Sequence, residues 1–190
     1  MTLKEKCTFL EERIKRLNEI GLSLSRENDI NVIFELIMEE AKNITNADGR
    51  TLYMISDDGK TMKFEIMQTD SMNFAQGGTI GVEITIPPMQ LFDEEGNPNH
   101  SSNVAYSANT GKTTNIKDVY TAKGFDFTGP KTFDKNTGYK TKALMSVPLK
   151  NHENDIVGVM QLINARDSKN EKTIAFSAVS YTHLTLPTKA

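Results

Sequence analysis

Residues 133–164 read FDKNTGYKTKALMSVPLKNHENDIVGVMQLIN, and this stretch decides the fold. It contains two apolar runs of strand length, at residues 143–149 and 156–163, and the polar turn at 151–154 joins them. A polar loop rich in hydroxyl groups, residues 134–141, comes directly before the first run. The pattern predicts a β-hairpin. The loop beside it offers hydroxyls and amides that suit a phosphate or the edge of a purine.

One polar residue interrupts the second apolar run. Strand alternation places Gln161 on the same face as Val157, Val159 and Ile163. A buried amide needs a hydrogen-bond partner. We therefore expect Gln161 to be partly buried and paired with another polar group.

Length and charge restrict the function classes. The chain has 190 residues, enough for one domain with a hydrophobic core, and a net charge of -3. Because there is no basic stripe, nucleic acid is an unfavourable partner. No apolar run approaches the roughly 20 residues of a membrane span, and residues 1–6 lack the apolar segment of a signal peptide. A single cysteine, Cys7, fits a reducing compartment, so we expect a cytoplasmic protein.

The first segment, residues 1–26, has the spacing of a coiled-coil helix. Leucines recur every seven residues, and a second series falls four residues after the first three of them: Leu3, Leu10, Leu17 and Leu24, then Cys7, Ile14 and Gly21. We expect a signalling helix that supports a homodimer. An amphipathic helix packed on its own domain explains the spacing equally well.

Residues 27–177 read as one domain of mixed helices and strands. Asn28 or Asp29 can cap a helix, because a short acceptor satisfies the free amides of the first turn. The expected apolar face of this helix contains Ile30, Ile33, Phe34, Ile37, Ala41 and Ile44. Alternation and length predict strands at 51–55, 62–67 and 82–86, with a hairpin turn at 57–60.

The second half of this domain begins with a short helix. Ser101 or Ser102 can cap it, and it should run to Asn109 with Gly111 just past its end. Residues 115–133 form a long connection, of the kind that often binds a ligand or closes over one. Residues 172–176 resemble the start of a final helix.

No catalytic set emerges from the sequence. The three histidines, His100, His152 and His183, have no metal-ligand spacing, and there is no CxxC pair. Residues 110–113 resemble the end of a phosphate-binding loop, but Tyr106 stands where its first glycine belongs. We therefore expect a binding domain without enzymatic activity.

Several short sequence motifs occur together in this chain. They are NI-x-DVY at residues 115–120, FD-x-x-TGY-x-T at 133–141, VP at 147–148 and GV-x-QLIN at 158–164. In this combination the chain resembles the GAF domain, a small-molecule sensor module. The resemblance is strongest to the GAF domains of cyclic-nucleotide phosphodiesterases and bacterial HD-GYP phosphohydrolases. It implies an α/β fold with a central antiparallel sheet of about six strands, helices on both faces, and a preceding signalling helix.

The resemblance also implies ligand contacts, with a cyclic nucleotide as the ligand and neither a metal nor another cofactor. The matching positions lie in the first strand, the short helix, the DVY motif, the TGY-x-T loop and the last long strand. They are Thr51, Asn103, Val104, Tyr120, Thr137, Thr141 and Gln161. Core packing or turn formation is the alternative role for each of them.

The chain departs from the family at one motif. Phosphodiesterase GAF domains that bind cyclic nucleotides carry a dispersed NK…F…DE motif. Here Ala165 rather than lysine follows Asn164, Phe176 matches the phenylalanine, and the two acids would fall beyond it. The Lys–Asp ion pair of the family is therefore not expected, and cyclic-nucleotide binding is implied by the family rather than by these residues.

Residues 178–190 show no helical periodicity and resemble translated sequencing-adapter sequence. We therefore expect a non-native tail, and a fragment of a bacterial signal-transduction protein without its effector. The resemblance favours an HD-GYP phosphodiesterase of cyclic di-GMP as the effector, and a cyclase or histidine kinase is the second choice. Two alternatives remain open. One is a ligand-free dimerisation module, and the other is phosphodiesterase activity assigned by inheritance from full-length relatives.

Overall fold

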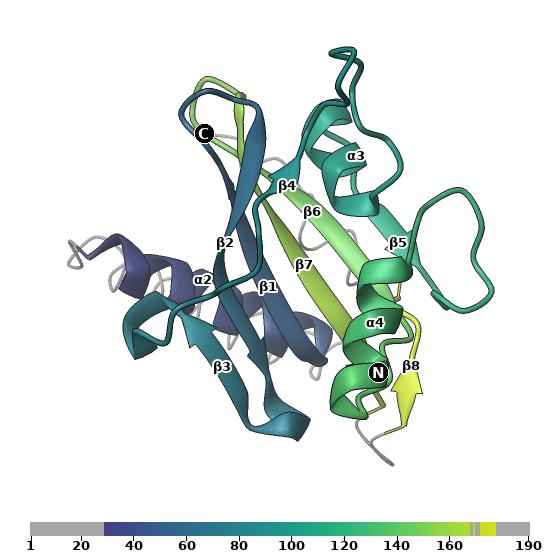
Figure 1. Cartoon of the computed structure of the whole chain (residues 1–190). Coiled ribbons are helices and arrows are strands. Elements are labelled where there is room, and N and C mark those ends of the chain that lie inside the picture. Colours follow the sequence, from purple (N-terminus) through teal and green to yellow (C-terminus); the bar gives the residue numbers. More distant parts are fainter. Residues whose placement is uncertain (1–28, 168, 170–171, 178–190) are drawn as a thin grey trace, which may run out of the picture.

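The computed structural model describes residues 29–167, 169 and 172–177, so the expected signalling helix at 1–26 and the tail at 178–190 lie outside the described residues. The described part is built on one eight-stranded sheet (Figure 1) with the strand order β3-β2-β1-β7-β6-β5, to which β4 adds beside β2 and β8 beside β7. Every pairing is antiparallel. The predicted fold class is confirmed, and the strands beyond the expected number are the two-residue β4 and β8.

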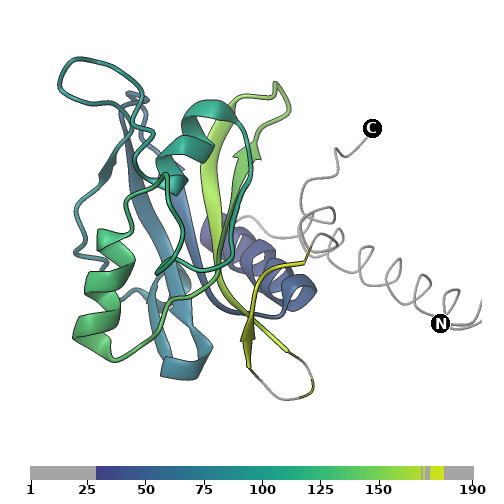
Figure 2. The ribbon, with the colours of Figure 1, turned by 90° about the vertical axis from the view of Figure 1, so that its right-hand side faces the viewer.

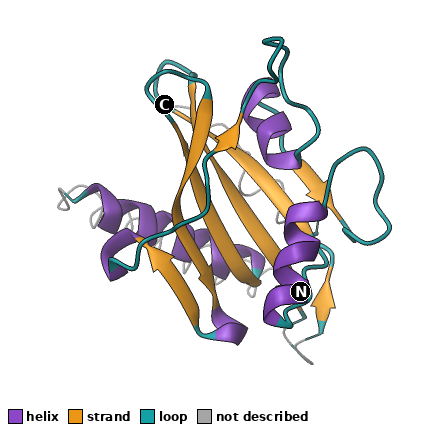
Figure 3. Ribbon diagram, viewed as in Figure 1, coloured by secondary structure: helices purple, strands orange, loops and turns teal. Residues whose placement is uncertain are grey.

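Strands and short helices follow one another along the chain (Figure 3). The strands are β1 (Ala47–Ile55), β2 (Thr61–Thr69), β3 (Phe74–Gly77), β4 (Met89–Gln90), β5 (Thr114–Ile116), β6 (Leu144–Lys150), β7 (Ile156–Arg166) and β8 (Thr173–Ile174). The helices are α2 (Ile30–Thr45), α3 (Asn103–Thr110) and α4 (Thr128–Thr137), with 3-10 turns at Asp70–Met72 and Gly78–Ile80. The hairpin predicted within residues 133–164 is β6–β7, and β7 pairs with β1 at the centre of the sheet.

Helix α2 covers one face of the sheet, and Asp29 caps it as predicted by accepting a hydrogen bond from the Asn31 amide. Its buried face is only partly the predicted one. Met38 and Ala41 pack into the core, whereas Ile30 and Ile44 are 54% and 38% exposed. The isoleucines misled the prediction because α2 carries apolar residues on more than one side, and a period of 3.6 residues does not show which side faces the sheet.

Helices α3 and α4 lie on the opposite face (Figure 2). Ser102 caps α3 by accepting hydrogen bonds from the amides of Val104 and Ala105, and Gly111 ends it in the left-handed conformation, both as predicted. α4 was not predicted. Its residues include the first half of the expected polar loop at 134–141, so that only the part from Gly138 onward is a loop.

Two predicted elements are wrong. Residues 82–86 form no strand, and Val82 and Ile86 are 48% and 42% exposed. Gly77, Gly78 and Gly81 just before them have φ values of 74°, 56° and 71°, a conformation that turns the chain out of the sheet and that glycine adopts without strain.

The expected helix start at residues 172–176 contains β8 instead. Thr173 pairs with Arg166 and Ile174 with Ala165, so the chain folds back along the end of β7. The Asp167 amide donates to the Lys172 carbonyl and closes this turn. Backbone pairing with a long neighbouring strand therefore overrides the weak helical signal.

The sheet separates two apolar clusters. Under α2 the sheet contributes Leu52, Ile66, Met145, Met160 and Leu162, all nearly inaccessible. Under α3 it contributes Tyr53, Met62 and Val159. The strands β1 and β7 approach closely between these clusters at Gly158, which pairs with Met54.

Replacing Gly158 with alanine should destabilise the domain by about 1–3 kcal/mol, because the sheet must deform to admit a methyl group. A Cβ there would collide with the Tyr53 carbonyl oxygen and lie 2.9 Å from the Met54 sulfur. Urea unfolding measures the loss. Gly129→Ala is the matched control, since a Cβ at this helical position meets nothing within 4 Å and should be neutral or stabilising. Equal stability of the two variants would contradict the close approach of β1 and β7.

Candidate functional site

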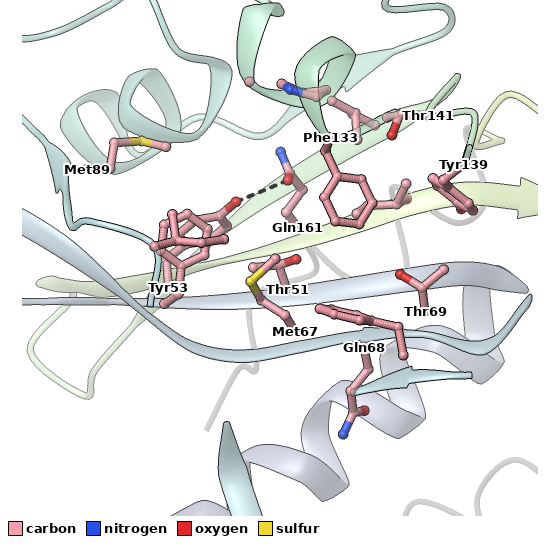
Figure 4. Close-up of a pocket in the computed structure, with 17 residues that line it drawn as sticks. Thr51, Tyr53, Met67, Gln68, Thr69, Met89, Phe133, Tyr139, Thr141 and Gln161 are labelled. Carbon is pink, nitrogen blue, oxygen red and sulfur yellow. Dashed lines mark hydrogen bonds between the residues drawn. The ribbon is translucent and has the colours of Figure 1, made fainter. Parts of the chain in front are cut away.

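A pocket lies between the sheet and α4, on the face opposite α2 (Figure 4). Its volume is about 240 Å³. Its walls are mostly aromatic rings, methionines and aliphatic side chains, with a few hydroxyls and amides among them. The lining residues are Thr51, Tyr53, Phe64, Met67, Gln68, Thr69, Phe74, Ile86, Met89, Gly129, Pro130, Phe133, Tyr139, Thr141, Leu144, Gln161 and Ile163.

A chain of hydrogen bonds fixes the Gln161 amide in the pocket wall. The Tyr53 hydroxyl donates to Gln161 Oε1 at 3.3 Å, and Gln161 Nε2 donates to Ser146 Oγ at 3.2 Å. Asn103 Nδ2 donates to the same Ser146 oxygen at 2.8 Å. Burial raises the pKa of the Tyr53 hydroxyl, so it stays a neutral donor. The prediction that Gln161 is buried and paired is confirmed.

The aromatic side chains stand on both sides of Gln161. Tyr53 packs on Phe64 with ring centroids 4.7 Å apart. On the other side, Phe133 of α4 contacts Phe74 of β3 and Tyr139, with centroid distances of 6.2 Å and 6.4 Å. These edge-to-face contacts join α4 to the edge of the sheet and enclose the pocket.

The buried carboxylate of Asp134 fixes the chain that follows α4. It accepts hydrogen bonds from the amide and the hydroxyl of Thr141, each at 2.8 Å, and from the Tyr120 hydroxyl. Asp134 is 6% exposed. The carboxylate therefore joins α4, the segment between α4 and β6, and the connection after β5.

Asn164 fixes the same loop from the opposite end. Its Oδ1 accepts the amides of Lys142 and Ala143 at 2.7 Å and 3.0 Å, while its Nδ2 donates to the Tyr139 hydroxyl and the Lys140 carbonyl at 2.9 Å and 2.8 Å. Its φ of 55° is one that asparagine tolerates better than most residues. The asparagine of the GV-x-QLIN motif thus holds the loop that forms part of the pocket wall.

Asp48 connects this loop to the end of β7. Its carboxylate accepts from the Tyr139 hydroxyl at 2.7 Å and the Ser71 hydroxyl at 2.7 Å, and pairs with the Arg166 guanidinium at 2.8 Å. Burial alone would raise the pKa of Asp48, but these hydrogen bonds outweigh it and hold the pKa below its usual range. Although Ala165 replaces the family's lysine, an arginine–aspartate pair forms one residue later.

The structure brings together three of the seven predicted contact residues. Thr51, Thr141 and Gln161 line the pocket. Asn103 and Val104 are buried behind the wall, at 4% and 2% exposure.

Tyr120 and Thr137 do not line the pocket. The exposed Tyr120 packs against Lys140, whose Nζ lies 4.9 Å from the centre of its ring. The Thr137 hydroxyl donates to the Phe133 carbonyl within α4. Sequence reasoning missed the aromatic residues of the pocket, although alternation in β1 and β2 would have placed Tyr53 and Phe64 on one face.

The described residues bring no catalytic set together. His100 packs edge-on against Tyr106, with centroids 5.3 Å apart, and His152 lies in the β6–β7 turn. Within the described ranges no group of three or more His, Cys, Asp or Glu residues could hold a metal ion. None of the described helices has the length and apolar character needed to cross a membrane.

Comparison with known proteins matches the chain to a family and to curated relatives that include a phosphodiesterase. The model of the GAF domain matches residues 29–180. The dual 3',5'-cyclic-AMP and -GMP phosphodiesterase 11A of Takifugu rubripes is 42% identical over 65 residues, which are 34% of this chain and 7% of that protein. The chain thus corresponds to a small part of this relative.

Solved structures share the fold at low sequence identity. The GAF domain of an Acinetobacter phosphoenolpyruvate-protein phosphotransferase is 11% identical, with a TM-score of 0.57 over 91% of this chain and 85% of that one. The free methionine-R-sulfoxide reductase of Neisseria meningitidis, in complex with its substrate, is 12% identical, with a TM-score of 0.54 over 88% of this chain and 80% of that one. These likenesses support the fold.

Asp48→Asn should destabilise the domain by about 1–3 kcal/mol, because it leaves the partly exposed Arg166 guanidinium without its carboxylate and weakens the bonds from Tyr139 and Ser71. Since the folded-state pKa of Asp48 is lowered, its contribution is present above the unfolded pKa of about 4 and is lost as pH falls through the folded value. Urea unfolding at pH 7 and at lower pH measures both effects. Asp57→Asn, in the exposed β1–β2 turn, is the control. A wild type and a D48N variant of equal stability at pH 7 would refute this assignment.

Proposed function

The chain belongs to the GAF family, and we propose that it is a regulatory sensor domain that holds a small molecule in the pocket under α4. The observation that supports binding is the Gln161 amide, which neighbouring groups hold in one orientation at the wall of a cavity of about 240 Å³. Small-molecule sites combine mostly apolar walls with a few oriented polar groups. An empty cavity of this kind would destabilise the fold, because the side chains around it would lack packing contacts.

Signal output would leave through the end of β7. Tyr139 lines the pocket and also donates to Asp48, which is paired with Arg166 at the start of the turn to β8. A ligand that prefers one position of the Tyr139 ring would therefore favour one arrangement of this strand end. Such a preference is what a ligand needs in order to shift a conformational equilibrium.

The larger protein is a further part of the proposal. We propose that the domain belongs to a bacterial cytoplasmic signalling protein with an HD-GYP phosphodiesterase effector, because the motifs at residues 115–164 resemble those of such proteins. The match to a phosphodiesterase relative supports a link to nucleotide signalling, but it spans only 7% of that protein. Residues 1–26, the proposed dimerisation segment, lie outside the described residues.

Ligand binding is tested by thermal unfolding of the full 190-residue chain with adenosine, guanosine, cAMP, cGMP and cyclic di-GMP. A ligand at a hundred times its dissociation constant should add about 2.7 kcal/mol of stability. Thr51→Phe should abolish this gain, because the larger side chain fills the pocket from β1. Thr51→Val keeps the cavity and is the matched control.

A gain that persists in the Thr51→Phe variant would place binding elsewhere on the chain. If no compound stabilises the wild type while the chain forms a stable dimer by light scattering, the domain is a ligand-free dimerisation module and the sensor function is wrong.

A further inference from the structure

We propose that this pocket selects an uncharged nitrogen heterocycle of purine size, as a free base or nucleoside, and excludes the phosphate of a nucleotide. The inference rests on the proposed sensor function and specifies its ligand. The first observation is the charge of the wall. None of the residues that line the pocket in the described part of the chain is Asp, Glu, Lys or Arg. A phosphate placed there would lose its hydration without gaining an opposite charge, which is unfavourable.

The amino-terminal end of α4 does not supply the missing positive charge. Gly129 and Pro130 of this first turn line the pocket, and free amides at such an end commonly hold a phosphate. Here the Thr128 amide donates to Asp126 at 2.8 Å, and the Lys131 amide donates to the Phe127 carbonyl at 3.1 Å. Proline has no amide hydrogen to donate. At most the Gly129 amide remains for a ligand.

Asp126 occupies the anion position itself. Its Oδ1 accepts both the amide and the hydroxyl of Thr128, at 2.8 Å and 2.6 Å. These hydrogen bonds hold the pKa of Asp126 below its usual value, so the carboxylate is charged at neutral pH. A phosphate arriving at this helix end would meet this negative charge, which the nearby Lys131 offsets only in part because its Nζ lies over the Tyr120 ring. A neutral ligand would meet no such repulsion.

Nearby cations are engaged elsewhere. Lys131 and Lys140 lie over the Tyr120 ring, with Nζ atoms 5.7 Å and 4.9 Å from its centre, and neither lines the pocket. On other surfaces Lys42 and Arg50 pair with Asp70, and Arg166 pairs with Asp48. Within the described residues, these basic groups have partners outside the pocket.

The pocket does have groups that recognise a flat heterocycle. Gln161 uses one amide hydrogen on Ser146 and one carbonyl lone pair on the Tyr53 hydroxyl, which leaves one donor and one acceptor. A glutamine amide in this state pairs with the donor–acceptor edge of a purine such as adenine. Figure 4 shows Gln161 between Tyr53 on one side and Phe133 and Tyr139 on the other. These rings can cover the faces of a flat ligand.

Size supports the same class. The cavity of about 240 Å³ falls below the roughly 300 Å³ at which sites for drug-sized ligands begin. A purine base is small and rigid enough for such a space. A cyclic dinucleotide carries two bases, two sugars and two phosphates and would require the wall to open.

Isothermal titration of the full chain with two matched pairs tests the charge preference: adenosine against cAMP, and guanosine against cGMP. Each pair shares a base and a ribose and differs in the phosphate. We expect at least one nucleoside to bind about tenfold or more tightly than its cyclic nucleotide, because the anion is desolvated without a partner. Adenine and guanine are included to show whether the base suffices.

Two variants test the residues. Gln161→Leu should weaken nucleoside binding about tenfold or more, since the buried edge of the base then lacks its partner. Asp126→Asn keeps a capping side chain but removes its charge. It should reduce the preference for the nucleoside several-fold by strengthening cyclic-nucleotide binding. An unchanged ratio would overturn the repulsive role given to Asp126.

The outcomes separate this inference from the proposed function. Tighter binding of the nucleoside, lost in Thr51→Phe, supports both. Equal or tighter binding of cAMP or cGMP, also lost in Thr51→Phe, overturns the charge selection and leaves the sensor function standing. Absence of binding by all six purine compounds overturns the ligand class. The sensor function falls as well if cyclic di-GMP also fails to bind and the chain forms a stable dimer.

Discussion

The alternation of side chains along β7 is the constraint on which the site depends. β7 pairs with β1 on one edge and with β6 on the other, so its register is fixed from both sides. Met160 and Leu162 point into the core under α2, while Gln161 and Ile163 line the pocket. A slip of one residue would exchange the two sets. Such a slip would bury the Gln161 amide on the α2 side without a hydrogen-bond partner. This would be unfavourable, so the register that places Gln161 in the pocket is stabilised.

Three buried polar side chains then shape the chain that covers the sheet. Asp134, Asn164 and Asp48 each make hydrogen bonds to other segments, at separations of 14, 21 and 91 residues along the chain. Such groups would destabilise the fold if unpaired, and each therefore favours the one arrangement in which its bonds are made. The aromatic rings of Phe133 and Tyr139 gain fixed positions from this framework. The pocket is thus shaped by polar clamps, although its walls are mainly apolar.

The sequence predicts what local rules determine. Apolar runs of strand length predicted the β6–β7 hairpin, and alternation predicted the burial of Gln161. Capping chemistry predicted the start of α2 and both ends of α3. It missed α4, because Gly129 and Pro130 are poor helix formers and the helix depends on the bond of Asp134 to Tyr120 and the contact of Phe133 with Phe74. Tyr139 was missed as a pocket residue for the same reason: its position follows from Asp48 and Asn164 rather than from its neighbours in the chain.

Tyr139 links the pocket wall directly to the buried carboxylate beside the end of β7. Its ring belongs to the pocket wall, and its hydroxyl donates to Asp48. Burial and the bond to Asp48 raise the pKa of this hydroxyl, so it acts as a donor throughout the physiological range. A ligand that displaces the ring must therefore break a hydrogen bond to a buried carboxylate, whereas one that packs against the ring strengthens the existing network. Since Arg166 shares that carboxylate, under the proposed sensor function two kinds of ligand would favour different states of the same strand end, and the fit of the ligand to the Tyr139 ring would determine the sign of the response.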